Sequence, residues 1–325
     1  MNILELAAQN LTSPPVLAFA LGLLATAIKA DLRLPDAVYQ GLSFYLLIGI
    51  GIKGGVALRD AEFSEIALPI VGTIALGIVI PLLAFTILGP LTKLPAYERG
   101  ALAAHYGSTS LVTFTAAIVF LETAQTFVEG YMATLLAVLE IPGIIVGLLL
   151  ASRGMSRSVN FRESLAEVLT GKSIVLLAGG LLLGAVTGSA GYSQVEPFFG
   201  GLFTGVLTLF LLELGLIAGK RIGDLKKAGI RLVIFGIGFP VIAGTLGITV
   251  GLLTGLSVGG ATVLGVLSAA SSYIAAPAAV RLALPEASPG IYLTASLAIT
   301  FPFNLIIGIP LYSVIAEAIA GGLGL

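Results

Sequence analysis

The stretch HYGSTSLVTF, residues 105–114, interrupts an apolar part of the chain with the single histidine and a cluster of hydroxyl side chains. A glycine inside a helix costs about 1 kcal/mol relative to alanine, so Gly107 weakens a continuous helix at this point. A break in a helix leaves backbone N–H groups without partners, and the new helix N-terminus carries roughly half a positive charge. We therefore expect an interrupted helix with polar ends.

The composition of the whole chain makes this cluster unusual. Of the 325 residues, 57% are hydrophobic and 10% are charged, and the mean hydropathy is +1.09. Soluble domains carry about 25% charged residues, and a helix that crosses a bilayer needs about 20 mainly apolar residues. The chain repeats such segments with short polar breaks between them. We predict a single polytopic, all-α membrane protein embedded in lipid.

Hydropathy and the polar breaks predict ten transmembrane helices. The expected spans are residues 14–30, 37–57, 66–89, 98–121, 130–151, 172–190, 198–219, 229–254, 258–283 and 290–319. The N-terminus has no basic region before its first apolar run and no small-residue cleavage site, so we expect the first segment to be kept as a span.

Several classes of function are excluded by composition. The chain has no cysteine, which rules out disulfides, thiol catalysis and cysteine-based metal sites. One histidine leaves little for a metal cluster, and a net charge of −1 without a basic surface argues against a nucleic-acid partner.

Lysine and arginine residues predict the orientation, because cytoplasmic loops collect them. If the N-terminus lies outside, all 16 of these residues except Lys53 and Arg59 fall in cytoplasmic links. The predicted location is the cell (inner) membrane, with both termini extracytoplasmic.

The two halves of the chain repeat one another. GIKGGVALRD, residues 51–60, lies 164 positions before GLIAGKRIGD, residues 215–224, and Pro142 lies 160 positions before Pro302. An odd number of spans per repeat makes the second copy enter the membrane from the other side. We predict two five-helix inverted-topology repeats with discontinuous helices, at residues 1–151 and 172–325, joined by a cytoplasmic linker at 152–171.

The ninth span contains SAASSYIAAPAAV, residues 268–280, at the place that matches residues 105–114. Pro277 lacks a backbone donor and clashes with the preceding turn. Two inverted breaks aim two helix N-termini at one point, and such ends bind anions. Each residue alone also suits a tight helix contact, where Ser, Thr and Gly are common. The candidate substrate-binding residues are Gly107, Ser108, Thr109, Ser110, Ser271, Ser272 and Tyr273.

Groups near the breaks also offer ligands for a cation or a proton. Hard cations take oxygen ligands, and an ionised, unpaired carboxylate in a bilayer costs about 2.5 kcal/mol or more. The candidates for sodium or proton coupling are Glu140, Thr300, Asn304, His105 and Glu213. The alternative for His105 is a hydrogen-bonded helix contact, and for the two carboxylates it is an interfacial or protonated position.

At these residues the chain resembles the sodium-dependent bicarbonate transporters known from cyanobacteria. The resemblance is carried, in the same order over nearly the whole chain, by IGIKGGVALRD, GSTSLVTFTAAIVFLE, EIPGIIVGLLLA, SAASSYIAAPAAVRLALPEASPGIYLTASLAI and IIGIPLY. It implies a ten-span inverted repeat, often a homotrimer, that imports bicarbonate with sodium. It also implies that the anion lies between the breaks of the paired discontinuous helices.

The resemblance extends to individual residues. The family's Gly-Ser-Thr and the end of its serine run match Gly107, Ser108, Thr109, Ser271 and Ser272. Glu140 stands where a cyanobacterial member has an aspartate before Ile-Pro. Tyr273 stands where the relatives have an aspartate, which removes a cation ligand. The relatives also carry a longer polar insertion between the halves and bind a soluble nucleotide-sensing regulator, a partner that the short link 152–171 does not support.

The leading hypothesis is a secondary active transporter that imports bicarbonate or a similar small anion with sodium by alternating access. One alternative is a proton-coupled anion carrier or cation/proton antiporter that uses Glu140, Glu213 or His105. Another is a membrane protein without transport activity. An intramembrane hydrolase built on His105 and a serine lacks an orienting carboxylate at a matching position. We expect no enzyme and no cofactor, with sodium as the coupling ion.

Overall fold

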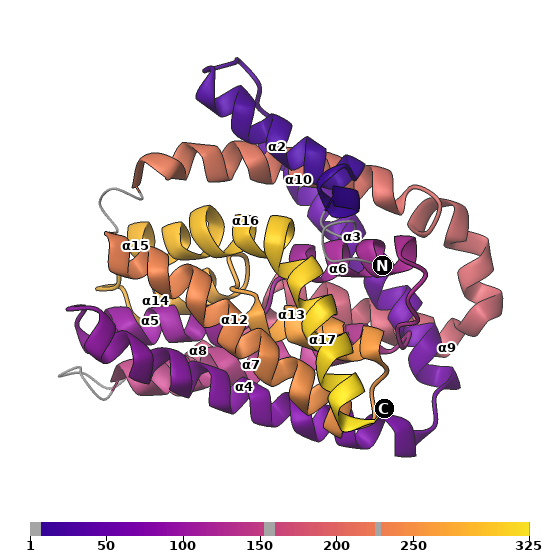
Figure 1. Ribbon diagram of the computed structural model, residues 1–325. Helices are drawn as coiled ribbons and strands as arrows, with labels where there is room; N and C mark the ends of the chain where they lie inside the picture. Colours follow the sequence, from indigo (N-terminus) through magenta and orange to yellow (C-terminus); the bar gives the residue numbers. More distant parts are fainter. Residues whose placement is uncertain (1–7, 153–159, 225–228, 325) are drawn as a thin grey trace.

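The computed structural model describes residues 8–152, 160–224 and 229–324, and every regular element in these ranges is a helix (Figure 1). The first half contains α2 (Pro14–Ala27), α3 (Asp36–Asp60), α4 (Phe63–Leu91), α5 (Ala96–Gly107), α6 (Leu111–Thr123) and α7 (Met132–Ser152). The predicted linker contains a further helix, α8 (Phe161–Thr170).

The second half begins directly after α8. It contains α9 (Lys172–Phe199), α10 (Phe203–Arg221), the 3₁₀ turn η1 (Ile222–Asp224), α12 (Ile230–Leu253), α13 (Val258–Ala269) and α14 (Ala276–Ala283). The last apolar segment alternates α-helical and π-helical turns, as α15 (Pro289–Leu293), η2 (Thr294–Thr300), α16 (Phe301–Phe303), η3 (Asn304–Gly308) and α17 (Ile309–Leu323).

The predicted all-α membrane class is confirmed. Eight described helical segments are long and apolar enough to cross a bilayer: Asp36–Asp60, Phe63–Leu91, Ala96–Thr123, Met132–Ser152, Lys172–Phe199, Phe203–Arg221, Ile230–Leu253 and Pro289–Leu323. The two remaining predicted spans correspond to shorter apolar helices, Pro14–Ala27 and Val258–Ala269. The first of these ends three residues before the predicted boundary, ahead of Lys29, whose φ of 56° is not helical. Ten transmembrane helices therefore remain a prediction.

Helix α9 bends at Gly188, close to the predicted end of that span at residue 190. Gly188 has a φ of 62°, a backbone conformation that glycine adopts without steric cost. The bend frees carbonyl groups, and Nη1 of Arg59 donates to the carbonyl oxygen of Val186 at 3.2 Å. The helix then continues to Phe199, so the predicted boundary marks a bend and not an end.

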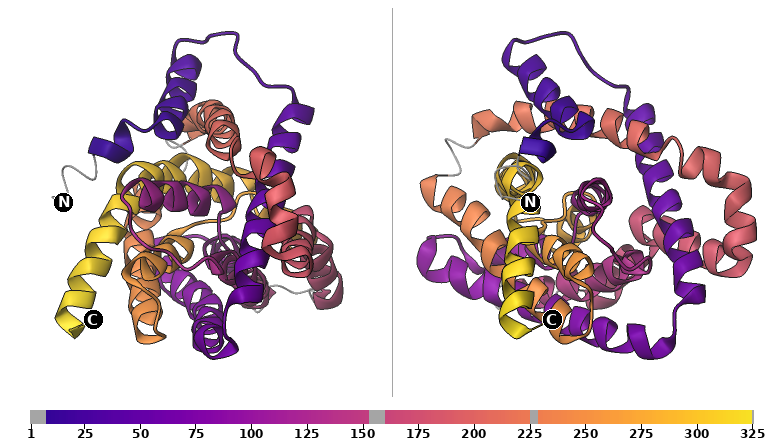
Figure 2. Two further views of the ribbon diagram at one scale, coloured as in Figure 1. Left: turned by 90° about the vertical axis from the view of Figure 1, so that its right-hand side faces the viewer. Right: turned by 45° about the vertical axis from the view of Figure 1, so that its right-hand side comes forward.

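Four helices form an outer group around the others. α2 packs mainly against α10, and α3 packs mainly against α9. The two views of Figure 2 show these indigo, rose and salmon segments along the top and one side of the orange and yellow helices. The inner group contains α4, α5, α7, α12, α13 and α17, which pack mainly against one another.

Glycine pairs set how closely the outer helices approach. A Cβ atom added to Gly51 of α3 would lie 2.8 Å from Cα of Gly180 in α9. One added to Gly22 of α2 would lie 2.9 Å from Cα of Gly215 in α10. Small residues at such crossings let helix backbones come close in a membrane, where no hydrophobic driving force joins helices.

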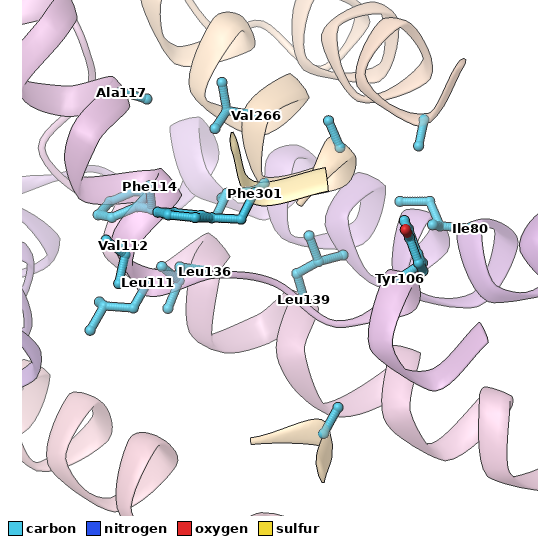
Figure 3. Packing of buried hydrophobic residues seen from close by; sticks show 14 of the residues in the cluster. Ile80, Tyr106, Leu111, Val112, Phe114, Ala117, Leu136, Leu139, Val266 and Phe301 are labelled. Carbon is cyan, nitrogen blue, oxygen red and sulfur yellow. The ribbon is translucent and has the colours of Figure 1, made fainter. Parts of the chain in front are cut away.

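Glycines also allow the inner helices to pack closely beside the first break. A Cβ atom on Gly107, at the end of α5, would lie 2.9 Å from Cα of Gly143 in α7 and 2.9 Å from Cβ of Pro81 in α4. Tyr106 lies close to Ile80 in Figure 3, and both side chains are fully buried in the apolar core. The end of α5 is therefore fixed by close backbone packing.

Adjacent glycines in α9 offer a matched test of the outer crossing. Gly180→Val pushes a side chain into α3, whereas Gly179→Val points into space with no atom within 4 Å of the added Cβ. We expect Gly180→Val to lower the free energy of unfolding by about 1–3 kcal/mol more than Gly179→Val, because overpacking carries that cost. Thermal unfolding in detergent measures the difference, and equal shifts for both variants would contradict the close crossing.

Candidate functional site

Two unwound segments, residues 108–110 and 270–275, meet inside the inner group. The first separates α5 from α6 and the second separates α13 from α14, so both predicted interruptions are present. The backbone of Ser108 is extended, with φ −91° and ψ −179°. The N–H group of Ser272 in the second segment donates to the carbonyl oxygen of His105 at 2.8 Å. This bond joins the two breaks directly.

A serine accepts a hydrogen bond from the first turn of the helix that follows each break. Ser110 is the N-cap residue of α6, whereas Ser272 lies before Ala275, the N-cap residue of α14. Oγ of Ser110 accepts from the N–H of Thr113 at 3.2 Å, and Oγ of Ser272 accepts from the N–H of Ala276 at 3.2 Å. Serine is among the preferred N-cap residues because its oxygen pairs one of the free N–H groups of the first turn. The remaining free groups and the helix dipole make the starts of α6 and α14 attractive to an anion.

Two hydroxyl groups at the crossing have unused hydrogen-bonding capacity. Oγ of Ser108 and Oγ1 of Thr109 are buried and have no hydrogen-bond partner within the described residues. Leaving a buried polar group unpaired costs about 1–3 kcal/mol. A small ligand with oxygen atoms placed between them removes this cost.

A small cavity of about 20 Å³ opens at this crossing, which is room for about one water molecule. Its polar lining comes from both breaks and from two neighbouring helices: Thr109, Ser110, Glu140, Ser173, Ser272 and Tyr273. Oγ of Ser110 donates to the hydroxyl of Tyr273 at 3.2 Å. The carboxyl group of Glu140, from α7, is the acidic group at this cavity, and the residue is only 5% exposed.

The last membrane segment presents a polar stripe to both breaks, at four-residue spacing. Oγ of Ser296 lies 2.7 Å from Oγ of Ser271, and Oγ1 of Thr300 lies 2.6 Å from the hydroxyl of Tyr106. Nδ2 of Asn304 donates to the carbonyl oxygen of Ala269, the last residue of α13, at 2.8 Å. The π-helical turns, with i→i+5 bonds, keep residues four apart on one face.

Thr300, Asn304 and Tyr106 were expected near the breaks, but Ser296 and Tyr312 were not. Thr300 also donates to the carbonyl oxygen of Gly236 in α12 at 2.7 Å, and Tyr312 donates to Oδ1 of Asn304 at 2.9 Å. Ser296, Thr300 and Asn304 are four residues apart in the sequence, and this regular spacing is the signal from which the stripe could have been predicted.

Of the other two coupling candidates, Glu213 lies elsewhere, and His105 has one ring nitrogen paired and the other, Nε2, buried without a partner among the described residues. Nδ1 of the fully buried His105 pairs with the carbonyl oxygen of Ala101 at 2.7 Å, and its ring stacks on Tyr292 with centroids 4.3 Å apart. Glu213 accepts from the N–H of Leu34 at 3.2 Å, in the α2–α3 connection. It therefore holds a connecting segment and does not line the cavity at the crossing.

Asn304 offers a test of how strongly the stripe supports the second break. Asn304→Ala leaves the carbonyl of Ala269 and the hydroxyl of Tyr312 without this partner, and the cost of unpaired buried groups is about 1–3 kcal/mol each. Tyr312→Phe leaves one buried group, Oδ1 of Asn304, without its partner, and therefore carries this cost of about 1–3 kcal/mol only once. Thermal unfolding in detergent should rank Asn304→Ala as the less stable variant, and the reverse order would contradict this support.

Comparison with known families identifies the chain. A family model described as "Na⁺-dependent bicarbonate transporter superfamily" matches residues 14–317, nearly the whole chain. A search of curated proteins finds no match. The chain belongs to this superfamily, so it is a transporter and an integral membrane protein and not an enzyme.

Proposed function

We propose that this member of the Na⁺-dependent bicarbonate transporter superfamily imports bicarbonate, or a similarly small anion, together with sodium. The observation that carries the proposal is the pair of buried, unpartnered hydroxyls of Ser108 and Thr109 beside two helix N-termini. The small cavity is lined by Leu111 and Ala275, at the starts of α6 and α14, so both N-termini reach it. The anion-binding set is Gly107, Ser108, Thr109, Ser110, Ser271, Ser272 and Tyr273.

The architecture proposed for this function is two inverted repeats of five spans, at residues 1–151 and 172–325. The outer glycine contacts support it. Gly51 of α3 meets Gly180 of α9, and Gly215, which aligns with Gly51 in the sequence repeat, meets Gly22 of α2. The first helix of each half thus packs on the second helix of the other half, as a two-fold relation between the repeats requires.

Alternating access follows from the division into two helix groups. The cavity at the crossing is water-sized and therefore smaller than bicarbonate needs. Ser173 of α9 and Leu47 of α3, both in the outer group, line it together with residues of the inner group. Movement of the outer helices against the inner ones enlarges the cavity and opens it to one side of the membrane.

Sodium binds beside the anion in this proposal, since the positive charge offsets the cost of carrying an anion through a low-dielectric interior. The C-terminal ends of α5 and α13 carry partial negative charge. Glu140, Thr300 and Asn304 supply further oxygen atoms near the two breaks. The hydroxyl of Tyr273 occupies the position of an acidic side chain in the cyanobacterial relatives.

The assembly is proposed on the resemblance and the charge distribution. Both termini face the extracytoplasmic side of the cell membrane, because the lysines and arginines gather in the opposite links. The resemblance favours a homotrimer surrounded by lipid.

A proton-coupled carrier is the second candidate, and one observation favours it. Glu140 is buried at the cavity and no hydrogen bond or ion pair holds its carboxyl group within the described residues. A carboxyl group in that position is a candidate to exchange a proton during transport.

Two buried, unpartnered serines provide a matched test of the anion site. Ser108→Ala should lower the uptake of labelled bicarbonate by about tenfold or more, since a hydrogen bond to a charged ligand contributes about 1.5–3 kcal/mol. Ser43→Ala removes an equally buried, unpartnered hydroxyl in α3 and should leave uptake unchanged. Ser108→Leu and Ser272→Leu should abolish uptake. Undiminished uptake by folded Ser108 variants would overturn the site.

The coupling ion is tested in proteoliposomes that contain the wild-type chain. Uptake of labelled bicarbonate should rise with an inward sodium gradient at one fixed pH and stay at the level of protein-free liposomes without sodium. The opposite result is uptake that follows a pH gradient in sodium-free buffer. If uptake follows the pH gradient and the Glu140→Gln variant loses this uptake, the chain is coupled to protons and not to sodium.

A further inference from the structure

A second, larger cavity of about 200 Å³ lies beside the site already described. It is bounded by α3, α6, α7, α9 and the start of α10. Its lining is mixed, with apolar side chains such as Phe114 and Phe203 and with polar ones that include Thr115 and Tyr192. The volume is ample for several water molecules or hydrated ions.

The two cavities follow one another along the same helices. α3 contributes Leu47 to the small cavity and Ile50 to the large one, and α6 contributes Leu111 and Phe114 in the same way. Three residues rise about 4.5 Å along a helix, which is slightly less than one turn. Figure 3 shows Leu111 beside Leu136, another residue of the small cavity, with Phe114 further along α6. An apolar layer about one turn thick therefore separates the cavities.

An ion pair lies in the large cavity. Nζ of Lys53 in α3 is 2.9 Å from Oε1 of Glu122 at the end of α6, and the two side chains are 63% and 54% exposed. An ion pair this exposed contributes about 0–1 kcal/mol to stability, so folding does not require it. Charged side chains within membrane segments mark ion pathways.

Close contacts hold the Lys53 region of α3 in place. A Cβ atom added at Gly54 would lie 2.6 Å from Cβ of Ala133 in α7, and one added at Gly51 would reach α9 as described above. A third charged residue, Glu129, also lines the cavity, and both of its carboxylate oxygens accept hydrogen bonds from Ser257. Oε1 accepts from the N–H of Ser257 at 2.6 Å, and Oε2 accepts from the hydroxyl of Ser257 at 3.0 Å. Lys53 and Glu122 are thus a neutral pair facing open space.

We propose that the large cavity is a first binding station on the way to the crossing, where Lys53 takes the anion and Glu122 takes the sodium ion. The inference rests on the proposed function, because it assigns an earlier position to the same two ions. When both ions bind, the anion replaces Glu122 as the partner of Lys53, and the sodium ion replaces Lys53 as the partner of Glu122. The net charge of the cavity is therefore the same when it is empty and when it is loaded. The ions then cross the apolar layer together.

Uptake kinetics test the station with charge-neutralising variants. Lys53→Gln should raise the bicarbonate concentration for half-maximal uptake by about two- to fivefold, the ratio that one partly exposed charge pair supplies. Glu122→Gln should raise the half-saturating sodium concentration by a similar factor. Maximal rates should stay at the wild-type value. Lys93→Gln, at an exposed lysine between α4 and α5, is the control and should change neither constant. Unchanged constants in both variants would overturn the station.

Thiol labelling supplies a readout that does not need transport. The chain has no cysteine, so Ile118→Cys places a single thiol in the large cavity. An anionic, membrane-impermeant thiol reagent should label it, and adding Lys53→Gln should slow the anionic reagent relative to a cationic one. Leu148→Cys, which is buried in α7, should stay unlabelled.

The two experiments separate the station from the function. If the wild-type chain shows no sodium-dependent uptake but labelling depends on Lys53, the proposed function fails and the charge-selective cavity remains. If the wild-type chain transports and neither labelling nor half-saturation responds to Lys53 and Glu122, the station is wrong and the function stands.

Discussion

A backbone N–H or C=O group inside a bilayer has no water to bind, and each unsatisfied group costs several kcal/mol. This constraint governs the two helix breaks. The N–H group of Ser272 pairs with the carbonyl oxygen of His105 across the crossing. The hydroxyls of Ser110 and Ser272 accept from N–H groups in the first turns of α6 and α14, and the amide of Asn304 donates to the last carbonyl of α13. Among the buried polar atoms without a partner, the hydroxyls of Ser108 and Thr109 belong to the first break itself and are the ones that we assign to a ligand.

Two separate sets of glycine contacts hold the inner and the outer helices together. Glycine contacts hold the end of α5 close to α7, next to the residues proposed to bind the anion. The outer helices contact one another through a second set of glycines and contribute side chains to both cavities. The proposed site and the outer helices are therefore packed through separate sets of contacts.

Sequence reasoning located the helix breaks well, because their causes are local. Gly107, the hydroxyl cluster and Pro277 each weaken a helix whatever surrounds them. The first interruption begins directly after Gly107, and the second ends just before Pro277, which lies in the first turn of α14. It placed Glu213 among the coupling candidates because a buried carboxylate demands a partner, yet that partner is the backbone of Leu34. It did not identify Ser296, since a lone serine in an apolar segment is common at helix contacts.

The sequence by itself determined that the chain is a helical membrane protein with two polar interruptions. The length, hydropathy and glycine or proline content of a segment decide whether it forms a membrane helix, and these properties do not depend on tertiary contacts. Its motifs also identified the family over nearly the whole chain. Only the tertiary structure decided which polar groups meet: Ser272 with His105, Ser271 with Ser296, and Lys53 with Glu122. Those contacts join residues far apart in the chain, and they depend on how helices cross, which no local pattern encodes.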